Sequence, residues 1–523
     1  MAVRVMTLRN ANAALKHWAE TRADAVALHT ADGEMTYRTL ESMVEALAGR
    51  LAMAGIQRCV LFLDNGPGWV VADLALRRAG CVIVPVPVFF SAEQIKHAFL
   101  EAGVDAVITD APAQLQALLP AGWLGTGEPI GNAVQLNGVM LCGAVLGDAG
   151  PRTLPIGTHK VTFTSGTTGR PKGVCLSEVA IDTVASSLCE ASDGSVGDKH
   201  LSLMPFAALL ENIAGIDIPL LAGAEFCALP LGTLGFSGSS GLQPQQLIAA
   251  MDRYRPTSIV TVPQILNVLM AMAERAGWRP SYLRHVAVGG AVLAKGAVGR
   301  ARELGLPVFE GYGLSECCSV VTLNTVRADR PDSVGRPLPH CRVSLAADGE
   351  VMVHGIGAVG YLGTEAAPAQ SADGAIATGD IGRFDEDGFL HLLGRKKNMF
   401  ITAFGRNVAP DWVESELTTT PVIAQAFVSG EARPWNVAII VPGPAALAAD
   451  PSDLSRRISA AIETVNLRLP DYAQVRRWLL ADQPFQPRNG QLTWNGRLRR
   501  EEIATRYQDR LDNLYKEEMV HVF

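Results

Sequence analysis

Residues 161–174 have the composition of a loop that binds phosphate groups. An apolar, strand-like entry is followed by hydroxyl residues, glycines and Lys172, which has a proline before it and a glycine after it. Glycines let backbone N–H groups approach a phosphate closely, hydroxyls add donors, and the lysine adds positive charge. The order differs from the Walker loop, and a plain glycine-rich turn is the alternative. Lys172 is a candidate catalytic residue, and the candidate nucleotide-binding residues are Thr164, Ser165, Gly166, Thr167, Thr168 and Gly169.

Residues 310–316, Glu-Gly-Tyr-Gly-Leu-Ser-Glu, follow a strand-like stretch and carry a second set of suitable groups. Tyr312 offers a flat face to an adenine ring, and Ser315 offers a hydroxyl to a phosphate. Glu316 offers a carboxylate that suits Mg²⁺, so it is both a catalytic and a metal-binding candidate. Gly313 completes the nucleotide-binding candidates of this segment. An ordinary strand-to-helix turn is the alternative for so short a motif.

Taken together and in this order, these segments resemble the signature motifs of the adenylate-forming superfamily. That superfamily includes acyl-CoA synthetases, luciferases and the adenylation domains of peptide synthetases. Residues 161–174 resemble its phosphate loop, and residues 310–316 resemble its Y-G-x-T-E element, with Ser315 in place of the threonine. The resemblance covers nearly the whole chain. It implies that ATP and Mg²⁺ are used to activate a carboxylic acid as its acyl-adenylate, and that a thiol then accepts the acyl group.

The same resemblance assigns roles to residues nearer the C-terminus. Asp380, in Thr-Gly-Asp, would accept hydrogen bonds from the two ribose hydroxyls, which a carboxylate can do. Arg395 would contact the nucleotide, and Lys397 would be the pivot about which a small domain turns during catalysis. Hairpin and solvated turns are the alternatives for these charged residues. The loop expected to lie against the pantetheine arm of the thiol donor contains Phe404, Gly405 and Arg406.

The acyl pocket is expected beside a strand that ends in glycines. Gly289, Gly290 and Ala291 match the strand end that lines this pocket in the superfamily, although a strand terminus that needs small residues is an equal alternative for each glycine. Long-chain relatives have a histidine where Ala208 falls, so one wall of the pocket is altered. Residues 204–210 lack the aspartate that amino-acid-activating enzymes use. A fatty or other hydrophobic acid is therefore favoured, and an aryl acid remains open.

Arg497 occupies the position of the superfamily's C-terminal catalytic lysine. Residues 489–497 match the N-G-x-L-T-x-x-x-K context of long-chain acyl-CoA synthetases except at this last position, and no lysine lies between Lys397 and Lys516. Arginine keeps the positive charge but is a planar fork in place of a compact ammonium group. We therefore expect Arg497 to act in adenylation, and a non-catalytic descendant that binds AMP or an acyl ligand is one alternative.

The acceptor of the acyl group is less defined than the activation step. Residues 401–408 resemble the long-chain branch, so coenzyme A is the expected thiol donor. The phosphopantetheine of an acyl carrier protein is the next alternative, because such proteins are acidic and Arg497, Arg499 and Arg500 could attract them. A non-thiol acceptor, giving an amide or a lactone, is the third.

Alternating helix-like and strand-like stretches must position these motifs. Residues 36–54 and 70–78 have helical periodicity, and residues 59–63 and 81–86 are short apolar runs, an alternation typical of a parallel sheet. Residues 161–321 form a second block of this kind, and residues 330–393 a small antiparallel unit. A glycine- and serine-rich patch at residues 232–241 is expected to be an exposed loop. Further predicted elements are residues 95–101, 106–109, 258–262, 286–288, 308–309, 350–353, 389–392, 399–402, 411–417, 438–441 and 454–467.

The 523 residues are too many for a single hydrophobic core, which predicts at least two domains. We expect a large N-terminal AMP-binding domain at residues 1–394, built from two doubly wound α/β subdomains and the small antiparallel unit. A small mobile α+β domain is expected at residues 395–523.

Composition excludes several other classes of protein. The net charge of −7 argues against an extended nucleic-acid-binding surface. The nine cysteines include no C-x-x-C pair, which makes a zinc site or a disulfide framework improbable. The longest apolar stretch, residues 81–90, is too short to span a membrane and contains two prolines. A cytoplasmic protein, monomeric or homodimeric, is expected.

Overall fold

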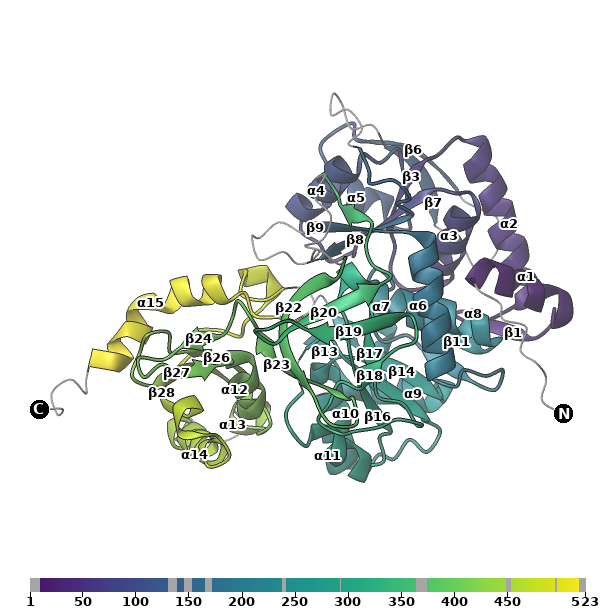
Figure 1. Ribbon diagram of the computed structural model, residues 1–523. Coiled ribbons are helices and arrows are strands. Elements are labelled where there is room, and N and C mark those ends of the chain that lie inside the picture. Colours follow the sequence, from purple (N-terminus) through teal and green to yellow (C-terminus); the bar gives the residue numbers. More distant parts are fainter. Residues whose placement is uncertain are drawn as a thin grey trace, which may run out of the picture.

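The computed structural model describes residues 10–129, 139–144, 153–164, 172–237, 241–291, 293–363, 374–447, 453–493 and 496–516. Figure 1 shows a large body that contains the N-terminal three quarters of the chain, and a smaller C-terminal body beside it. This is the predicted α/β fold with a large N-terminal and a small C-terminal domain. No helix in the described ranges is both long and apolar enough to cross a membrane.

The first sheet of the large domain has the strand order β21-β9-β8-β4-β3-β5-β7-β6. Its centre is parallel, since β3 (Arg58–Phe62) pairs with both β4 (Val82–Pro85) and β5 (Ala106–Thr109). These strands alternate with helices α3 and α4 as the sequence predicted. The other strands are β6 (Leu124–Pro129), β7 (Met140–Ala144), β8 (Lys160–Thr164), β9 (Lys172–Leu176) and β21 (Gly360–Tyr361).

The second sheet has the order β18-β17-β16-β15-β14-β10-β11-β1-β2. The sequence predicted that a second block would begin at residue 161, and this boundary is wrong. Strands β8 and β9 join the first sheet, while β1 from the N-terminus pairs with β11 of the second sheet and β2 pairs with β1. The strands are β1 (Val26–His29), β2 (Glu34–Thr36), β10 (Lys199–Leu201), β11 (Glu225–Cys227), β14 (Ser258–Thr261), β15 (His285–Val288), β16 (Val308–Tyr312), β17 (Thr322–Leu323) and β18 (Arg336–Pro337).

One hydrophobic core joins the two sheets. It contains apolar residues of β9, β11, α2, α3, α6 and α8, for example Leu176, Phe226 and Leu220, all fully buried. The helices of the large domain are α1 (Ala11–Thr21), α2 (Tyr37–Met53), α3 (Pro67–Arg78), α4 (Ala92–Ala102), α5 (Pro112–Leu118), α6 (Glu178–Ala191), α7 (Leu209–Asn212), a π-helical turn at Ile213–Asp217, α8 (Ile218–Ala222), α9 (Pro244–Tyr254), α10 (Pro263–Ala276) and α11 (Ala297–Glu303).

The patch at residues 232–241 is not simply an exposed loop. A short 3₁₀ turn at Leu231–Leu234 buries Leu234 completely, and β12 (Phe236–Ser237) pairs with β13 (Gly241–Leu242). Leu234 belongs to the core beneath the second sheet. Phe236 of the same run also packs against this core, so apolar side chains within a polar run anchor the segment.

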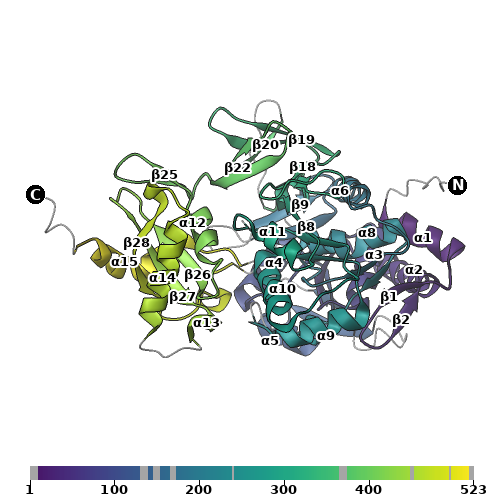
Figure 2. The same cartoon turned by 90° about the horizontal axis from the view of Figure 1, so that it is seen from below.

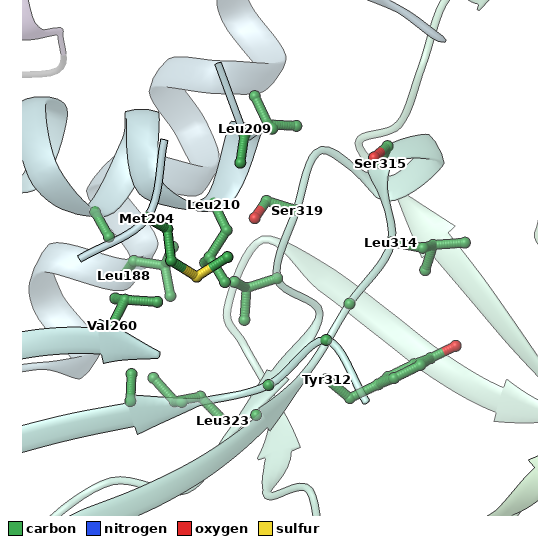
Figure 3. A pocket seen from close by; sticks show the side chains of 18 of the residues that line it. Leu188, Met204, Leu209, Leu210, Val260, Tyr312, Leu314, Ser315, Ser319 and Leu323 are labelled. Atoms are coloured by element: carbon green, nitrogen blue, oxygen red, sulfur yellow. The ribbon is translucent and has the colours of Figure 1, made fainter. Parts of the chain in front are cut away.

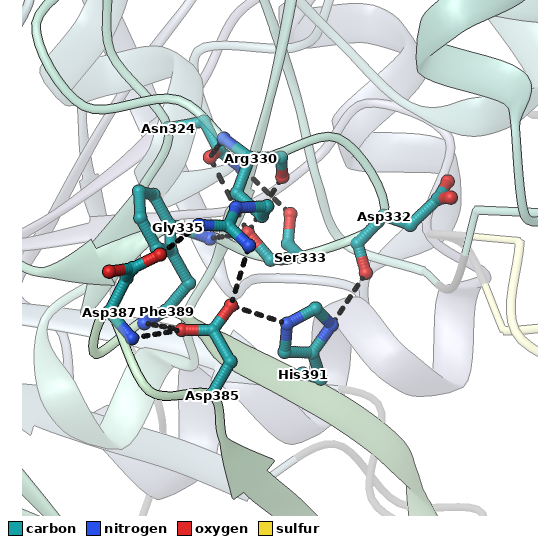
Figure 4. A network of polar contacts seen from close by, with 9 residues as sticks. All are labelled: Asn324, Arg330, Asp332, Ser333, Gly335, Asp385, Asp387, Phe389 and His391. Carbon is teal, nitrogen blue, oxygen red and sulfur yellow. Dashed lines mark hydrogen bonds and ion pairs between the residues drawn. The ribbon is translucent and has the colours of Figure 1, made fainter.

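The predicted small antiparallel unit is confirmed. Its sheet has the order β19-β20-β22-β23, formed by β19 (Cys341–Leu345), β20 (Glu350–Gly355), β22 (Ile376–Phe384) and β23 (Leu390–Arg395). Asp385, in the β22–β23 turn, accepts hydrogen bonds from the backbone N–H groups of Asp387 and Phe389 and pairs with Arg330, and His391 lies 3.1 Å from its Oδ2 (Figure 4). These contacts tie the unit to the preceding loop.

The C-terminal domain forms a separate body to one side of the large domain (Figure 2). Its main sheet has the order β26-β27-β28. The predicted elements at 411–417, 438–441 and 454–467 are confirmed. The elements are β24 (Phe400–Ile401), β25 (Asn407–Val408), α12 (Pro410–Leu417), β26 (Ile423–Ser429), β27 (Asn436–Pro442), α13 (Pro444–Leu447), α14 (Leu454–Asn466), β28 (Val475–Leu480) and α15 (Arg500–Lys516).

A buried charge cluster lies where the two α/β subdomains meet. Arg77 of α3 pairs with Asp73 and with Asp217, both at 2.8 Å, and Lys160 of β8 pairs with Asp73 at 2.8 Å. Burial alone would raise the pKa of Asp73, but Arg77 and Lys160 outweigh burial and hold it below its ordinary value. The two cations and two carboxylates therefore neutralise one another inside the core. Asn212 of α7 joins them, with its side-chain oxygen 2.5 Å from Lys160 Nζ.

Replacing Arg77 by methionine should lower the free energy of unfolding by about 3–5 kcal/mol, because it leaves buried carboxylates without their counter-ion. Urea denaturation followed by tryptophan fluorescence measures this. Arg38→Ala is the control, since Arg38 forms an exposed pair with Asp24 and should cost about 0–1 kcal/mol. Equal losses in the two variants would contradict a stabilising role for the cluster.

Candidate active site

A cavity of about 470 Å³ runs from the predicted nucleotide motifs into the large domain. Its outer part is lined by residues of the phosphate loop ends, of the segment after β16 and of the C-terminal domain. Its inner part is lined mainly by apolar side chains, among them Leu188, Met204 and Val260 (Figure 3). The cavity therefore joins a polar mouth to an apolar interior.

The two ends of the predicted phosphate loop are held side by side. Strands β8 and β9 are antiparallel, so Thr164 lies opposite Lys172, and the Thr164 hydroxyl donates to the Lys172 carbonyl at 3.3 Å. Both residues line the cavity, and Lys172 Nζ lies 5.7 Å from the centre of the Tyr361 ring. Ser165, Gly166, Thr167, Thr168 and Gly169 lie outside the described residues, so their predicted roles remain predictions.

Tyr312, Asp380 and Arg395 come together at the cavity mouth. The Tyr312 hydroxyl donates to Asp380 at 2.7 Å, and Arg395 Nε lies 2.8 Å from the other carboxylate oxygen. Burial raises the pKa of Asp380, while Arg395 and Tyr312 oppose it. Burial and the Asp380 charge raise the pKa of Tyr312, so its hydroxyl stays protonated. Tyr312 and Arg395 line the cavity, whereas Asp380, which both of them contact, is not among its lining residues.

The segment after Tyr312 turns tightly into a 3₁₀ turn at Ser315–Cys317. A Cβ at Gly313 would lie 1.6 Å from the Ser319 carbonyl oxygen, so only glycine fits there. Ser315 and Glu316 line the cavity, and the Tyr361 hydroxyl donates to Glu316 at 3.2 Å. No cluster of three or more His, Cys, Asp or Glu side chains that could hold a metal occurs in the described part of the chain. A single carboxylate nevertheless suits Mg²⁺ that is also held by nucleotide phosphates.

Arg497 of the C-terminal domain reaches into the cavity of the large domain. Its Nε and Nη2 atoms donate to the Gly290 carbonyl at 3.1 and 3.0 Å. Gly290 itself has φ +86, a conformation that other residues rarely adopt. Partial removal from water and the neighbouring charge of Arg395 lower the pKa of Arg497, while Asp380 opposes them, and the side chain keeps an exposed face at the cavity mouth. Two guanidinium groups thus converge on one site, which favours an anionic ligand.

The predicted acyl-pocket residues divide into two groups. Ala208, Gly289 and Gly290 line the cavity, whereas the exposed Ala291 is not among its lining residues. Sequence reasoning missed most of the apolar wall because its residues come from separate elements without a shared motif. The missed apolar wall residues include Leu188, Met204, Leu210, Ile218, Val260 and Leu323.

The predicted thiol-donor loop lies outside the cavity in this arrangement. Gly405 has φ +73 at the tip of the β24–β25 hairpin, and the neighbouring Phe404 is 76% exposed. Neither Phe404, Gly405 nor Arg406 lines the cavity, and the same holds for Lys397 in the connection between β23 and β24. The described structure therefore places Arg497, and not the hairpin, at the active-site mouth.

The three C-terminal arginines do not form one basic surface. Arg500 donates to Glu414 and to the Val428 carbonyl inside the small domain, and Arg499 pairs with Glu502. With Arg497 directed into the cavity, the argument that these three residues attract an acidic carrier protein loses its support.

Comparison with known protein families agrees with this geometry. Residues 15–364 match the model of the AMP-binding enzyme family, and residues 397–519 match the model of its C-terminal domain. This chain belongs to the AMP-binding enzyme family. The two matches leave residues 365–396 between them, and a boundary at residue 394 remains a prediction.

The curated relatives of this AMP-binding enzyme place it close to the fatty acyl-CoA ligase branch of the adenylate-forming superfamily. It is 28% identical to the long-chain-fatty-acid–CoA ligase FadD15 of Mycobacterium bovis, with 93% of each chain covered. It is 31% identical to 3-[(3aS,4S,7aS)-7a-methyl-1,5-dioxo-octahydro-1H-inden-4-yl]propanoyl:CoA ligase of Mycobacterium tuberculosis, over 81% of this chain and 86% of the relative.

Solved structures of similar proteins share the fold. The anthranilate CoA ligase AuaEII, in complex with anthranoyl-AMP, matches with a TM-score of 0.78 at 18% identity, covering 95% of this chain and 97% of that one. The amide bond synthetase McbA from Marinactinospora thermotolerans matches with a TM-score of 0.72 at 25% identity, over 94% and 100% of the two chains.

Gly313→Ala should abolish AMP binding and lower the thermal unfolding temperature, since the added carbon would force the Ser319 backbone to move. Isothermal calorimetry and thermal denaturation measure the two effects. Gly299→Ala, inside α11 with nothing within 4 Å of the new carbon, is the control and should be neutral or slightly stabilising. Normal AMP binding by the Gly313 variant would disprove the constraint.

Glu310, the first residue of the 310–316 motif, should make stability fall with rising pH. Burial and the Asp332 charge raise its pKa to about 8, above its ordinary value of 4.5. The folded state therefore binds its proton more tightly, and this contribution to stability is lost as the pH rises towards and through about 8. Glu310→Gln should flatten the decline between pH 6 and pH 9 in denaturant titrations. An unchanged slope would contradict the assignment.

Proposed function

We propose that this protein activates a hydrophobic carboxylic acid with ATP, forming an acyl-adenylate, and transfers the acyl group to coenzyme A. One observation carries the proposal. The guanidinium of Arg497 lies at the Gly290 carbonyl, where the nucleotide motifs meet the apolar interior of the cavity. A cation at that junction lies where the carboxylate of the acid and the α-phosphate of ATP would meet.

The first step would be attack of the carboxylate on the α-phosphorus. A carboxylate oxygen forms the new bond to phosphorus, the bond to the bridging oxygen breaks, and pyrophosphate leaves. Arg497 would stabilise negative charge on the transferring group, and Lys172 would neutralise the phosphates from the opposite side of the mouth. Tyr312 and Asp380 would hold the adenosine, so that the two reacting groups are oriented before reaction.

Mg²⁺ fits the arrangement through Glu316, whose carboxylate lines the cavity. When bound, the ion would neutralise phosphate charge, and the nucleotide would supply its remaining ligands. Tyr361 donates to the same carboxylate and would fix its orientation.

The second step requires a different position of the small domain. Arg497 now occupies the mouth, so a thiol could enter only after this residue withdraws. Rotation about Lys397 would remove Arg497 and bring the Gly405 hairpin to the cavity. The thiol sulfur would then attack the acyl carbonyl, lose its proton and displace AMP.

We expect the substrate to be a fatty acid or another acid with a hydrophobic chain. The apolar lining supports this proposal, as does the name of the relative FadD15, a long-chain-fatty-acid–CoA ligase. Other relatives are named as feruloyl-CoA synthase and indoleacetate–CoA ligase, so an aromatic acid is the second candidate.

A non-thiol acceptor is the alternative outcome for the second step. McbA, named as an amide bond synthetase, is 25% identical over nearly the whole chain. Product analysis with coenzyme A and with simple amines, supplied separately, distinguishes thioester from amide formation.

Arg497→Ala should reduce pyrophosphate release from MgATP and a fatty acid by about 10²–10³-fold in kcat, because one well-placed electrostatic contact to the transition state is lost. A coupled pyrophosphate assay measures it. Arg499→Ala is the matched control, since that arginine pairs with Glu502 on the small domain and should leave the rate near wild type.

The same Arg497 variant should still convert a synthetic acyl-adenylate and coenzyme A into thioester, since the second step does not use Arg497. Loss of both half-reactions would indicate that Arg497 stabilises the folded structure and has no specific role in adenylation. No pyrophosphate release by the wild type with any acid would favour the non-catalytic alternative.

A further inference from the structure

Polar side chains form a row at the inner end of the cavity. His200 of β10, Ser258 of β14 and His285 of β15 are register partners on neighbouring parallel strands, and all three line the cavity. Paired residues of parallel strands face the same side of the sheet. The next row towards the mouth, Val260 and Ala287, is apolar. An apolar tunnel that ends in three hydrogen-bonding side chains is not shaped for a plain hydrocarbon tail.

The three polar residues differ in how many of their side-chain polar atoms have hydrogen-bond partners. His200 Nδ1 lies 3.0 Å from the Ser258 hydroxyl, and His200 Nε2 lies 3.1 Å from Glu211, so both ring nitrogens have partners. His285 stacks on Phe309 with the ring centres 4.9 Å apart and is only 8% exposed. Its Nε2 is buried and has no hydrogen-bond partner among the described residues. Such a group is costly to leave unpaired, which points to a ligand atom.

The neighbouring charged side chains do not provide a hydrogen-bond partner for His285 Nε2. Arg284 and Asp198 also line the inner end, but they pair with each other at 2.5 Å, and Asp198 also accepts from Thr257. Burial and the Arg284 charge lower the pKa of His285 to about 4. His285 is therefore neutral near pH 7 and can form one hydrogen bond with a neutral oxygen, either as donor or as acceptor.

The distance between Gly289 and His285 gives the length of ligand that would join them. Gly289 lines the cavity near the mouth, one residue past the end of β15 and four residues after His285, which at about 3.3 Å per residue gives roughly 13 Å. An extended chain advances about 3.5 Å over three backbone bonds. Roughly eleven bonds therefore separate an acyl carbonyl at Gly289 from an atom at His285.

We propose that the preferred acid carries a neutral oxygen, a hydroxyl or a ketone, about ten to eleven bonds from its carboxyl group, and that His285 binds this oxygen. The inference rests on the proposed function for the position of the carboxyl group. It narrows the substrate class from any hydrophobic acid to a medium-length acid or ring system that is oxygenated at its far end.

Binding of non-hydrolysable sulfamoyl-adenosine analogues tests the inference independently of turnover. The 10-hydroxydecanoyl and undecanoyl analogues have the same number of non-hydrogen atoms and differ only in a terminal hydroxyl or methyl group. Calorimetry on the wild type should show that the hydroxylated analogue binds about five- to a hundredfold more tightly, the range expected for pairing one buried polar group. A 5-hydroxyundecanoyl analogue, with its hydroxyl against Val260 and Ala287, should bind more weakly than the undecanoyl analogue.

His285→Phe should reverse the preference, so that the undecanoyl analogue binds more tightly. Val286→Ala, one residue along the same strand in the apolar core on the opposite face, is the control and should keep the wild-type ratio. Equal affinity of the wild type for the hydroxylated and undecanoyl analogues, or a preference for the latter, would overturn the inference. So would a preference that persists in His285→Phe.

The same analogues separate this inference from the proposed function. If the wild type shows the hydroxyl preference but releases no pyrophosphate with the matching acid, the inference holds and the catalytic proposal fails. If pyrophosphate is released equally with both acids, the catalytic proposal holds and the inference fails. If no analogue binds, both fail.

Discussion

The buried pairing of Arg77 and Lys160 with Asp73 and Asp217 is the constraint on which the arrangement of the large domain depends. Charges removed from water must find opposite charges at close range, so α3, β8 and the π-helical turn can meet in one relative position only. Lys160 begins the strand that leads into the phosphate loop. Through Asn212, the same cluster fixes the short helix that carries Ala208 into the cavity. The predicted nucleotide site and the predicted acyl site therefore share one anchor.

The active site is assembled across a domain boundary, and this explains how a single cavity could serve two successive steps. The large domain supplies the tunnel and the Tyr312–Asp380 pair, and Arg497 reaches the mouth from the small domain. Arg497 hydrogen-bonds a backbone carbonyl, a contact that can be broken without leaving a buried side chain unpaired. The much more extensive cores of the two domains would stay intact if the small domain turned.

Prediction from the sequence worked best where a motif is local. The strands at residues 106–109 and 258–261 and the helix that ends at Leu417 follow from apolar periodicity, which reports the burial of nearby residues. The pairing of β1 with β11, the pairing of β2 with β1, and the placing of β8 and β9 in the first sheet were missed. Sheet order depends on contacts between segments far apart in the sequence, such as Leu28 with Phe226 and Ile83 with Lys160, and periodicity carries no information about them.

The sequence by itself predicted residues that the structure places at the cavity mouth, because a short motif holds Tyr312, Ser315 and Glu316 within five positions and a second motif ends at Arg497. The chemical roles of these residues remain predictions. The tertiary structure alone decided that Arg497 lies at Gly290, that the hairpin of Gly405 lies away, and that Ala291 is outside the cavity. It also decided the row of His200, Ser258 and His285. Those residues lie on three strands separated by helices, and only the register of a folded sheet places them at the same level.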